Sequence, residues 1–226
     1  MTLFHLLNRG VDKRKIFLDD KDRFRFIHDL FEFNNTAPAN PNVRRFNVGH
    51  PMSNIEIHRA GTGKRKLLVR IHAFCLMQNH YHMLVSPILE DGIPRFMKKL
   101  NMGYAKYFNE RYKRTGALWQ GKYKSVPIET DRHFLHIPYY IHFNPLDLSF
   151  PEWRDREVKN KKKALEYLKT YRWSSHLDYL GIKNFPSITQ REFLLDLFEG
   201  EKGYAESLNE TLEGFSAEEV EGKTLE

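Results

Sequence analysis

Three stretches of the chain have the apolar pattern of β-strands. Residues 3–8 alternate loosely between apolar and polar positions and end at Arg9-Gly10, where the glycine permits a tight turn. Residues 67–77 are rich in β-branched and apolar side chains, and residues 81–85 resume the pattern after the turn-like pair Gln78-Asn79. The second and third stretches are therefore predicted to form an antiparallel pair.

Apolar residues at helical spacing predict two helices around these strands. The first follows the N-cap candidates Asp19-Asp20 and runs to about Asn34. The second keeps its apolar stripe almost unbroken over residues 93–108, and the same stripe is typical of core packing. Both helices are expected to bury one face against the sheet.

A third helix is predicted to end at Asn144-Pro145, because the residue before a proline is disfavoured in helical conformation. Asp131 can cap its start, and the apolar pattern continues to Phe143. Pro138 interrupts the pattern, since a mid-helix proline kinks or shortens a helix. The helix therefore starts either at Asp131 or near Ile137, with the proline in its first turn.

The rest of the chain divides into a long loop and a helical extension. Residues 35–66 contain several prolines and glycines and are predicted to be mostly loop, with a short strand at residues 55–58. Beyond Pro151, helical patterns cover residues 161–171, 173–180 and 189–198. We expect a main domain over residues 1–150, a helical extension packed on it over residues 151–200, and an acidic, partly disordered tail over residues 201–226.

Composition indicates a globular protein, with 41% hydrophobic and 14% aromatic residues in a chain of 226. No run approaches the roughly 20 apolar residues that a membrane-spanning helix needs, so we expect no membrane partner and a cytoplasmic location. The single cysteine, Cys75, lies in an apolar strand, which excludes a disulfide framework and a cysteine-based zinc site.

Charge is distributed unevenly along the chain, whose formal net charge is +7. Residues 95–124 carry nine Lys or Arg against one acid, and residues 196–226 carry ten acids against two lysines. The basic stretch includes the segment 116–125, where aromatic and basic residues mix. That mixture suits single-stranded nucleic acid, because aromatic rings stack on bases and lysines meet phosphates, but it suits an ordinary edge strand equally well. Candidate DNA-binding residues are Arg9, Lys98, Lys99, Lys106, Trp119, Gln120, Lys122 and Lys124.

Candidate chemistry centres on the pair His80 and His82. Side chains alternate along a strand, so these two imidazoles share a face while Tyr81 points the opposite way. In the third helix, Tyr140 and Asn144 are four residues apart and also share a face. If that helix packs on the histidine face, Asn144 completes a metal site for Mg²⁺ or Mn²⁺ and places the Tyr140 hydroxyl beside it. An isolated His-x-His pair alone is weak evidence for a metal site.

Several ordered motifs resemble those of the single-tyrosine HUH transposases of the REP-associated type, within the IS200-like superfamily. The matching stretches are FHLLNRG at 4–10, MQNHYHMLV at 77–85, the basic segment 116–125, YIHFNP at 140–145 and residues 171–179. Together they span most of the chain, and motifs in series are more specific than any one alone.

The resemblance implies an α+β fold with a ferredoxin-like antiparallel sheet flanked by helices. It also implies a metal-dependent enzyme that nicks single-stranded DNA near hairpins and rejoins it, through a 5′-phosphotyrosine intermediate. By the same resemblance Tyr140 is the nucleophile, His80 and His82 are metal ligands, and Asn144 occupies the position of the third ligand. Such enzymes act as monomers or homodimers.

Two departures and two rival functions accompany this interpretation. The middle residue of the HUH motif is the bulky Tyr81, and Tyr139 adjoins Tyr140, so the nucleophile assignment depends on the spacing to Asn144. The rivals are a domesticated module that binds hairpin DNA without cutting it, and an RNA-binding protein or RNA endonuclease, since basic and aromatic surfaces also accept RNA.

Overall fold

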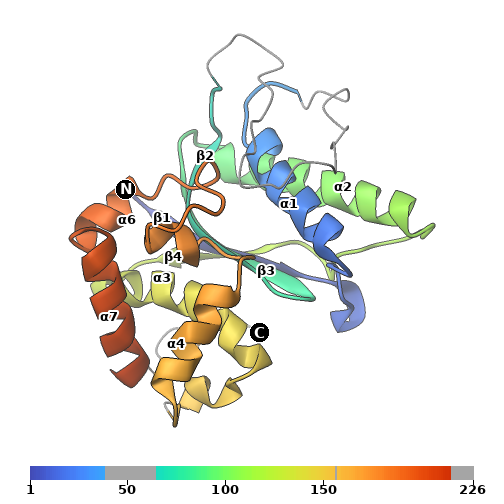
Figure 1. Cartoon of the computed structure of the whole chain (residues 1–226). Helices are drawn as coiled ribbons and strands as arrows, with labels where there is room; N and C mark the ends of the chain where they lie inside the picture. The colour runs from blue at the N-terminus through green and yellow to red at the C-terminus, as the bar shows by residue number, and fades with distance from the viewer. Residues whose placement is uncertain (39–64, 156, 215–226) are drawn as a thin grey trace.

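A four-stranded antiparallel sheet lies at the centre of the molecule (Figure 1). The computed structural model describes residues 1–38, 65–155 and 157–214. The strands are β1 (Leu3–Arg9), β2 (Val69–Leu76), β3 (His80–Pro87) and β4 (Lys124–Ile128), in the order β2-β3-β1-β4. Helix α1 (Asp20–Phe33) joins β1 to β2, and α2 (Gly92–Arg111) joins β3 to β4. This order and these connections are ferredoxin-like, which confirms the predicted α+β fold.

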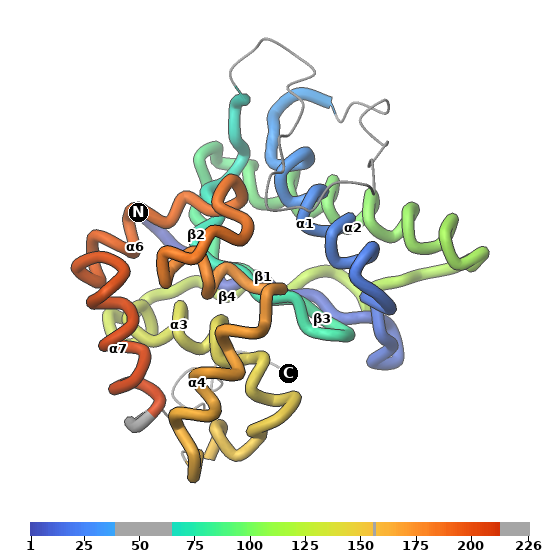
Figure 2. Tube along the Cα trace, viewed as in Figure 1, coloured from blue at the N-terminus to red at the C-terminus, as the bar shows by residue number. Residues whose placement is uncertain are grey.

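Helices cover both faces of the sheet, so the molecule has three layers (Figures 1 and 2). Helices α1 and α2 pack together on one face, over a core that includes Phe26, Tyr81 and Tyr104. Helix α3 (Asp131–Phe143) and the C-terminal helices lie on the other face, over a second core that includes Tyr140 and Trp153. Tyr81 is fully buried on the α1/α2 side, as strand alternation predicted, and its hydroxyl donates to Asn101 Oδ1 at 2.8 Å.

Helix α3 begins at Asp131, so the alternative start near Ile137 is wrong. Thr130 caps the helix, with its hydroxyl accepting from the backbone N–H of His133 at 3.2 Å. Pro138 lies inside the helix and is buried. A proline costs the helix one backbone hydrogen bond, and the burial of this helix against the sheet offsets that cost.

The C-terminal part is helical throughout most of its described length. After α3 come the 3-10 helices η3 (Asn144–Leu148) and η4 (Pro151–Asp155), followed by α4 (Lys161–Thr170), α5 (His176–Tyr179), α6 (Glu192–Leu197) and α7 (Gly200–Gly214). Helix α7 differs from the prediction, because residues 201–214 were expected to belong to an acidic tail. Its apolar residues Tyr204, Leu208 and Leu212 are buried, and this spacing of four residues makes the helix amphipathic.

Two predictions concern residues that the structure does not describe. The strand expected at residues 55–58 and residues 215–226 of the expected tail both lie outside the described ranges. The predicted helices at 173–180 and 189–198 do appear, but in the shorter forms α5 and α6.

The outer edge of β2 is paired with the C-terminal extension. Leu76 donates its backbone N–H to Trp173 O at 2.9 Å, and Ser175 donates its own to Phe74 O at 3.0 Å. Farther along the strand, the backbone N–H of Gln190 donates to Ile71 O at 2.8 Å. The extension is therefore bonded to the sheet itself, and the segment around Trp173 serves packing.

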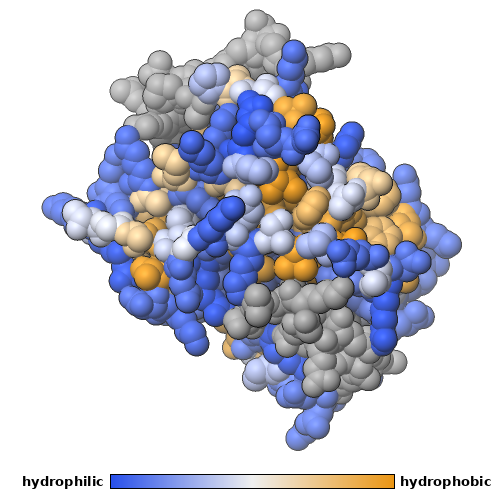
Figure 3. All heavy atoms as spheres, turned by 180° about the vertical axis from the view of Figure 1, so that it is seen from behind, coloured by the Kyte–Doolittle hydropathy of each residue, from blue (hydrophilic) through white to orange (hydrophobic). Residues whose placement is uncertain are grey.

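Hydrophilic residues cover much of one face of the molecule (Figure 3). Seen from behind, hydrophobic residues gather near the centre of the face and hydrophilic residues surround them (Figure 3). No helix among the described residues is long and apolar enough to cross a membrane.

Candidate metal and tyrosine site

The two histidines of β3 lie on the sheet face that α3 covers. In the antiparallel pairing of β1 and β3, His80 lies opposite Arg9 and His82 lies opposite Leu7. His82 is fully buried and His80 is 7% exposed, and their ring centroids are 4.9 Å apart. Strand alternation thus brings the two imidazoles together, as the sequence predicted.

Three atoms at this site have lone pairs that no hydrogen bond uses and that could bind a metal. His80 Nδ1 lies 2.6 Å from Asn79 Oδ1, an acceptor, so Nδ1 carries the proton and Nε2 keeps its lone pair. The amide nitrogen of Asn144 donates to Tyr140 O at 2.7 Å, which leaves the amide oxygen of Asn144. Among the described residues, His80 Nε2, His82 Nε2 and Asn144 Oδ1 are all buried without a hydrogen-bond partner. Buried polar atoms are rarely left unsatisfied, and a divalent cation would satisfy all three.

Burial keeps both imidazoles neutral. It lowers the pKa of His80 to about 4, and the charges of Arg9 and Arg154 lower it further while Asp147 opposes them. Burial, followed by the neighbouring His80 and the imidazole of His5, lowers the pKa of His82 well below its usual value. A neutral imidazole is the form that binds a metal, so the ligands are ready at neutral pH without releasing a proton.

The third ligand would be an amide. Within the part of the chain that the structure describes, no group of three or more His, Cys, Asp or Glu side chains is placed to hold a metal ion. A third protein ligand for a cation at His80 and His82 would therefore have to come from another kind of group, such as a side-chain amide. The buried amide oxygen of Asn144 fits that role, because amide oxygens are ordinary ligands of hard cations.

Tyr140 lies against this histidine pair. Its ring centroid is 5.8 Å from that of His82 and 5.9 Å from that of His5, edge-on in both cases, and the side chain is fully buried. The neighbouring Tyr139 points elsewhere, into the core formed with α7, where its ring stacks on Tyr204 at 5.9 Å. Of the two adjacent tyrosines, Tyr140 is the one beside the histidines.

The segment that follows α3 covers Tyr140. The guanidinium carbon of Arg154 lies 5.8 Å from the centre of the Tyr140 ring, and the Trp153 ring lies 6.1 Å from it. Asp147 holds both covering residues, since it accepts from Trp153 Nε1 at 2.6 Å and from Arg154 NH2 at 2.7 Å. We call Asp147, Trp153 and Arg154 the cover. Sequence reasoning missed it, because nothing in the pattern of residues 144–155 shows that this stretch returns to α3.

His5 is a second residue that sequence reasoning missed. It is fully buried on β1, and its Nε2 lies 2.9 Å from His82 Nδ1. Burial, with a smaller contribution from His133, lowers the pKa of His5 to about 3. The sequence did contain a signal, because alternation along β1 puts Leu3, His5 and Leu7 on one face. Only the register of β1 on β3 shows that this face is the one that carries His80 and His82.

The candidate DNA-binding residues fall into two groups in space. Lys98, Lys99 and Lys106 lie on α2, which covers the opposite face of the sheet from Tyr140. The ammonium of Lys99 donates to the backbone oxygen of Ala37 at 2.7 Å, and Lys106 pairs with Glu110 at 3.7 Å. The structure therefore does not bring these three lysines to the tyrosine.

Trp119 also serves the core of the protein. Its ring packs against Tyr81 and Tyr104, and its Nε1 donates to Asn101 O at 2.9 Å. Packing of this kind favours the interpretation of its segment as an ordinary part of the sheet edge. The backbone confirms that role, since Gly10 and Trp119 form an antiparallel bridge.

The remaining candidates lie closer to the histidines. Arg9 is the strand partner of His80, and the backbone N–H of Gln120 donates to Arg9 O at 2.9 Å. Lys124 is the partner of Leu7 on β4, and Leu7 is the partner of His82, so cross-strand pairing puts Lys124 on the same face as His82. Gln120, Lys122 and Lys124 are exposed. Arg9 and Lys124 are thus the candidates that strand pairing places on the face of the histidines.

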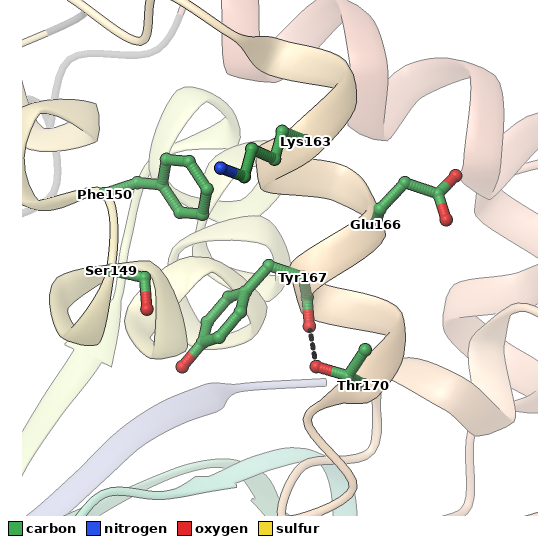
Figure 4. A pocket seen from close by; sticks show the side chains of 6 residues that line it. All are labelled: Ser149, Phe150, Lys163, Glu166, Tyr167 and Thr170. Atoms are coloured by element: carbon green, nitrogen blue, oxygen red, sulfur yellow. Dashed lines mark hydrogen bonds between the residues drawn. The ribbon is translucent and has the colours of Figure 1, made fainter.

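A surface pocket lies beside α4, away from the histidines (Figure 4). Its lining residues are Ser149, Phe150, Lys163, Glu166, Tyr167 and Thr170. The one interaction drawn there is the hydrogen bond from the Thr170 hydroxyl to Tyr167 O at 2.7 Å, which is a bond within α4. None of the predicted site residues lines this pocket.

Comparison with known proteins identifies the region that contains the site. Residues 58–144 match the family model described as "Transposase IS200 like". One solved structure that matches is a REP-associated tyrosine transposase bound to a REP hairpin, with 11% sequence identity, a TM-score of 0.43 and 82% of each chain covered. A search among curated proteins found no match. The part of the chain that runs from β2 to α3, and holds His80, His82, Tyr140 and Asn144, is therefore similar to the IS200-like transposase family.

Proposed function

We propose that the protein is a metal-dependent transposase that cleaves and rejoins single-stranded DNA near hairpins, with Tyr140 as the nucleophile. The observation that carries the proposal is the set of three buried atoms without hydrogen bonds, on His80, His82 and Asn144, beside the Tyr140 ring. Two imidazole nitrogens and an amide oxygen are all metal-binding groups, and their position near a tyrosine ring suits cleavage chemistry better than DNA binding alone.

In the proposed reaction, the phenolic oxygen of Tyr140 attacks the scissile phosphorus while the bond from phosphorus to the 3′ oxygen breaks. The products are a 5′-phosphotyrosine and a free 3′-hydroxyl, with the phenolic proton passing to the departing 3′ oxygen. Rejoining is the reverse attack by a 3′-hydroxyl on the phosphotyrosine. A divalent cation held by His80 Nε2, His82 Nε2 and Asn144 Oδ1 would supply charge neutralisation at the phosphate.

Basic residues around the site suit the path of the DNA backbone. Arg9 and Lys124 lie on the same sheet face as the histidines and would contact phosphates on either side of the scissile one. Tyr140 is fully buried under Trp153 and Arg154, so entry of the phosphate requires the cover to move. Arg154 is the cation of the cover, and its guanidinium lies over the Tyr140 ring. Once its ion pair with Asp147 breaks, Arg154 is suited to bind the phosphate.

A cleavage assay tests the proposal. Purified protein is incubated with labelled single-stranded hairpin DNA taken from repeats that flank its gene, with Mn²⁺ or with EDTA, and the products are separated on a denaturing gel. With Mn²⁺ we expect 5′-labelled DNA to give a shorter free fragment and 3′-labelled DNA to give a covalent protein–DNA band, and we expect both to be absent with EDTA. Substitution Tyr140→Phe abolishes both bands while DNA binding in a mobility-shift assay persists.

The burial of Tyr140 favours one alternative, a module that binds hairpin DNA or RNA without cutting it. Under this alternative the DNA is shifted but stays intact with Mn²⁺, Mg²⁺ and several flanking sequences. The same assay with DNA and RNA hairpins of matched sequence shows which of the two nucleic acids the protein cleaves. Cleavage of RNA but not of DNA would replace the proposed transposase with an RNA endonuclease.

A further inference from the structure

We propose that His5 is a positioning residue for the metal site, because it provides the hydrogen-bond acceptor that lets His82 offer its Nε2 to a cation. This inference rests on the proposed function, and it assigns a role to a residue of β1, outside the motif that contains the ligands. Its starting observation is the 2.9 Å contact between His5 Nε2 and His82 Nδ1.

Only one proton can occupy that contact when both rings are neutral. If His82 Nδ1 carries it, Nδ1–H donates to His5 Nε2 and His82 Nε2 keeps its lone pair. If His5 Nε2 carries it, His82 Nδ1 is the acceptor, and the proton of neutral His82 is on Nε2, where it blocks a metal. Metal binding at His82 Nε2 therefore requires His5 to accept the hydrogen bond.

His80, the other proposed ligand, makes the same kind of hydrogen bond through Nδ1. Its partner is an amide oxygen, which can only accept, so the position of the ring proton is defined. His80 Nδ1 donates to Asn79 Oδ1 at 2.6 Å, and this bond leaves His80 Nε2 for the metal. Metal-ligating histidines commonly donate their second ring N–H to an oxygen or another acceptor, which orients the ring and sets its tautomer. For His82, the residue in that position is His5.

Packing holds His5 in this orientation. Its ring is stacked on that of His82 with centroids 5.1 Å apart and an interplanar angle of 19°. On another side, it meets the edge of the Tyr140 ring at 5.9 Å. His5 thus touches both a ligand and the nucleophile, and among the described residues its own Nδ1 has no hydrogen-bond partner. The contact to His82 is therefore the hydrogen bond that His5 makes within the described structure.

Mn²⁺ affinity of the full chain tests this role, measured from the free Mn²⁺ signal in electron paramagnetic resonance. His5→Leu keeps an apolar side chain in the core but removes the acceptor, and His5→Gln restores an acceptor oxygen. We expect His5→Leu to weaken Mn²⁺ binding by about 10- to 100-fold, as does the loss of other residues that hydrogen-bond to metal ligands. We expect the Mn²⁺ affinity of His5→Gln to stay within about threefold of the wild type.

The matched control is His72→Leu. His72 is also a fully buried histidine of the sheet, but its Nε2 bonds to Ser86 Oγ at 2.9 Å, away from the ligands. This variant should lose stability without losing Mn²⁺ affinity. Circular dichroism and the melting temperature of each variant establish that the fold is retained.

The outcomes separate the two proposals. If wild-type protein binds no Mn²⁺ and cuts no DNA, the proposed function and the role of His5 fall together. If wild type binds and cuts but His5→Leu binds Mn²⁺ equally well, or His5→Gln fails as badly as His5→Leu, only the role of His5 is overturned. If His5→Leu does not fold, nitrogen NMR of the wild-type protein with Zn²⁺ tests the inference instead. We expect His82 to carry a proton on Nδ1 and to bind the metal through Nε2. Binding of the metal through Nδ1 would overturn the inference.

Discussion

Tyr139 and Tyr140 are adjacent in α3, yet their rings lie in different surroundings. The ring of Tyr140 lies 5.8 Å from His82, whereas the ring of Tyr139 lies 5.9 Å from Tyr204 of α7 and is parallel to it within 10°. Burial raises the pKa of Tyr139 to about 12, which makes this phenol harder to ionise. Adjacent residues of a helix point about 100° apart, and here that angle directs Tyr140 to the histidines and Tyr139 to Tyr204.

A pair of phenylalanine variants should therefore behave differently. Tyr140→Phe is expected to reduce the covalent protein–DNA band to background, because the attacking oxygen is gone. Tyr139→Phe is expected to retain it at a level within a fewfold of wild type. Both variants remove one hydroxyl from the same helix, so each is the other's control, and a loss of the band in Tyr139→Phe alone would reverse the assignment.

Loosening the cover should expose the tyrosine site. Asp147→Asn removes the charge that holds Arg154 and weakens the acceptor for Trp153, and hydrogen bonds to a charged group contribute about 1.5–3 kcal/mol. We expect faster hydrogen exchange over residues 144–155 by mass spectrometry. Glu166→Gln is the control, because Glu166 pairs with Lys169 on the exposed face of α4 at 3.3 Å. Equal exchange in the two variants would show that Asp147 does not hold the cover.

Tyr204 should be worth more to stability than its position near the C-terminus suggests. Its buried hydroxyl bonds to His142 Nδ1 at 2.7 Å and to His176 Nδ1 at 2.8 Å, and so joins α7 to α3 and α5. Tyr204→Phe leaves two buried ring nitrogens unsatisfied and is expected to lower the free energy of unfolding by about 1–3 kcal/mol.

Urea denaturation measures that loss, and Tyr167→Phe is the matched control. Tyr167 lines the surface pocket beside α4 (Figure 4), where loss of the hydroxyl should change stability by less than about 0.5 kcal/mol. Similar values for the two variants would mean that the hydroxyl of Tyr204 contributes little.

Stability should fall as the pH decreases below neutrality. Burial lowers the pKa of His5 and His176 to about 3 and that of His72 and His80 to about 4, while the unfolded chain titrates near 6.5. Between these values the unfolded state binds more protons, so protonation favours unfolding. Each histidine then costs up to about 1.4 kcal/mol at pH 5.5 relative to neutral pH.

Urea titrations without metal at pH 7.5, 6.5 and 5.5 measure the effect. The free energy of unfolding should decrease at each step. A constant value over this range would show that these histidines are reached by water in the folded protein.

The sheet and its histidine face were predictable because local pattern determines them. Alternation along β3 places His80 and His82 together, and helical spacing places Tyr140 over Asn144, whatever the rest of the chain does. The resemblance to the single-tyrosine HUH transposases then implied the ferredoxin-like fold. These features depend on residues close in sequence.

The features that were missed depend on residues far apart. His5 meets His82 only because β1 pairs with β3 in one register, and Arg154 meets Tyr140 only because η4 folds back over α3. The lysines of α2 were candidate DNA-binding residues because they lie in the basic stretch 95–124, yet their helix covers the face of the sheet opposite Tyr140. Helix α7 was hidden by its acidic composition, which masked an apolar residue at every fourth position.

The hydrogen bonds between the C-terminal extension and β2 also affect how two copies of this protein can associate. An open strand edge invites a second chain to add its own strand, which is a common route to sheet-mediated dimers and to aggregation. Here the backbone groups of Ile71, Phe74 and Leu76 already bond to the extension, and β4 at the opposite edge contains Pro127, which has no N–H to offer. A homodimer built from this fold would thus associate through side chains, and a chain cut before Trp173 would present β2 to its neighbours as a template for strand addition.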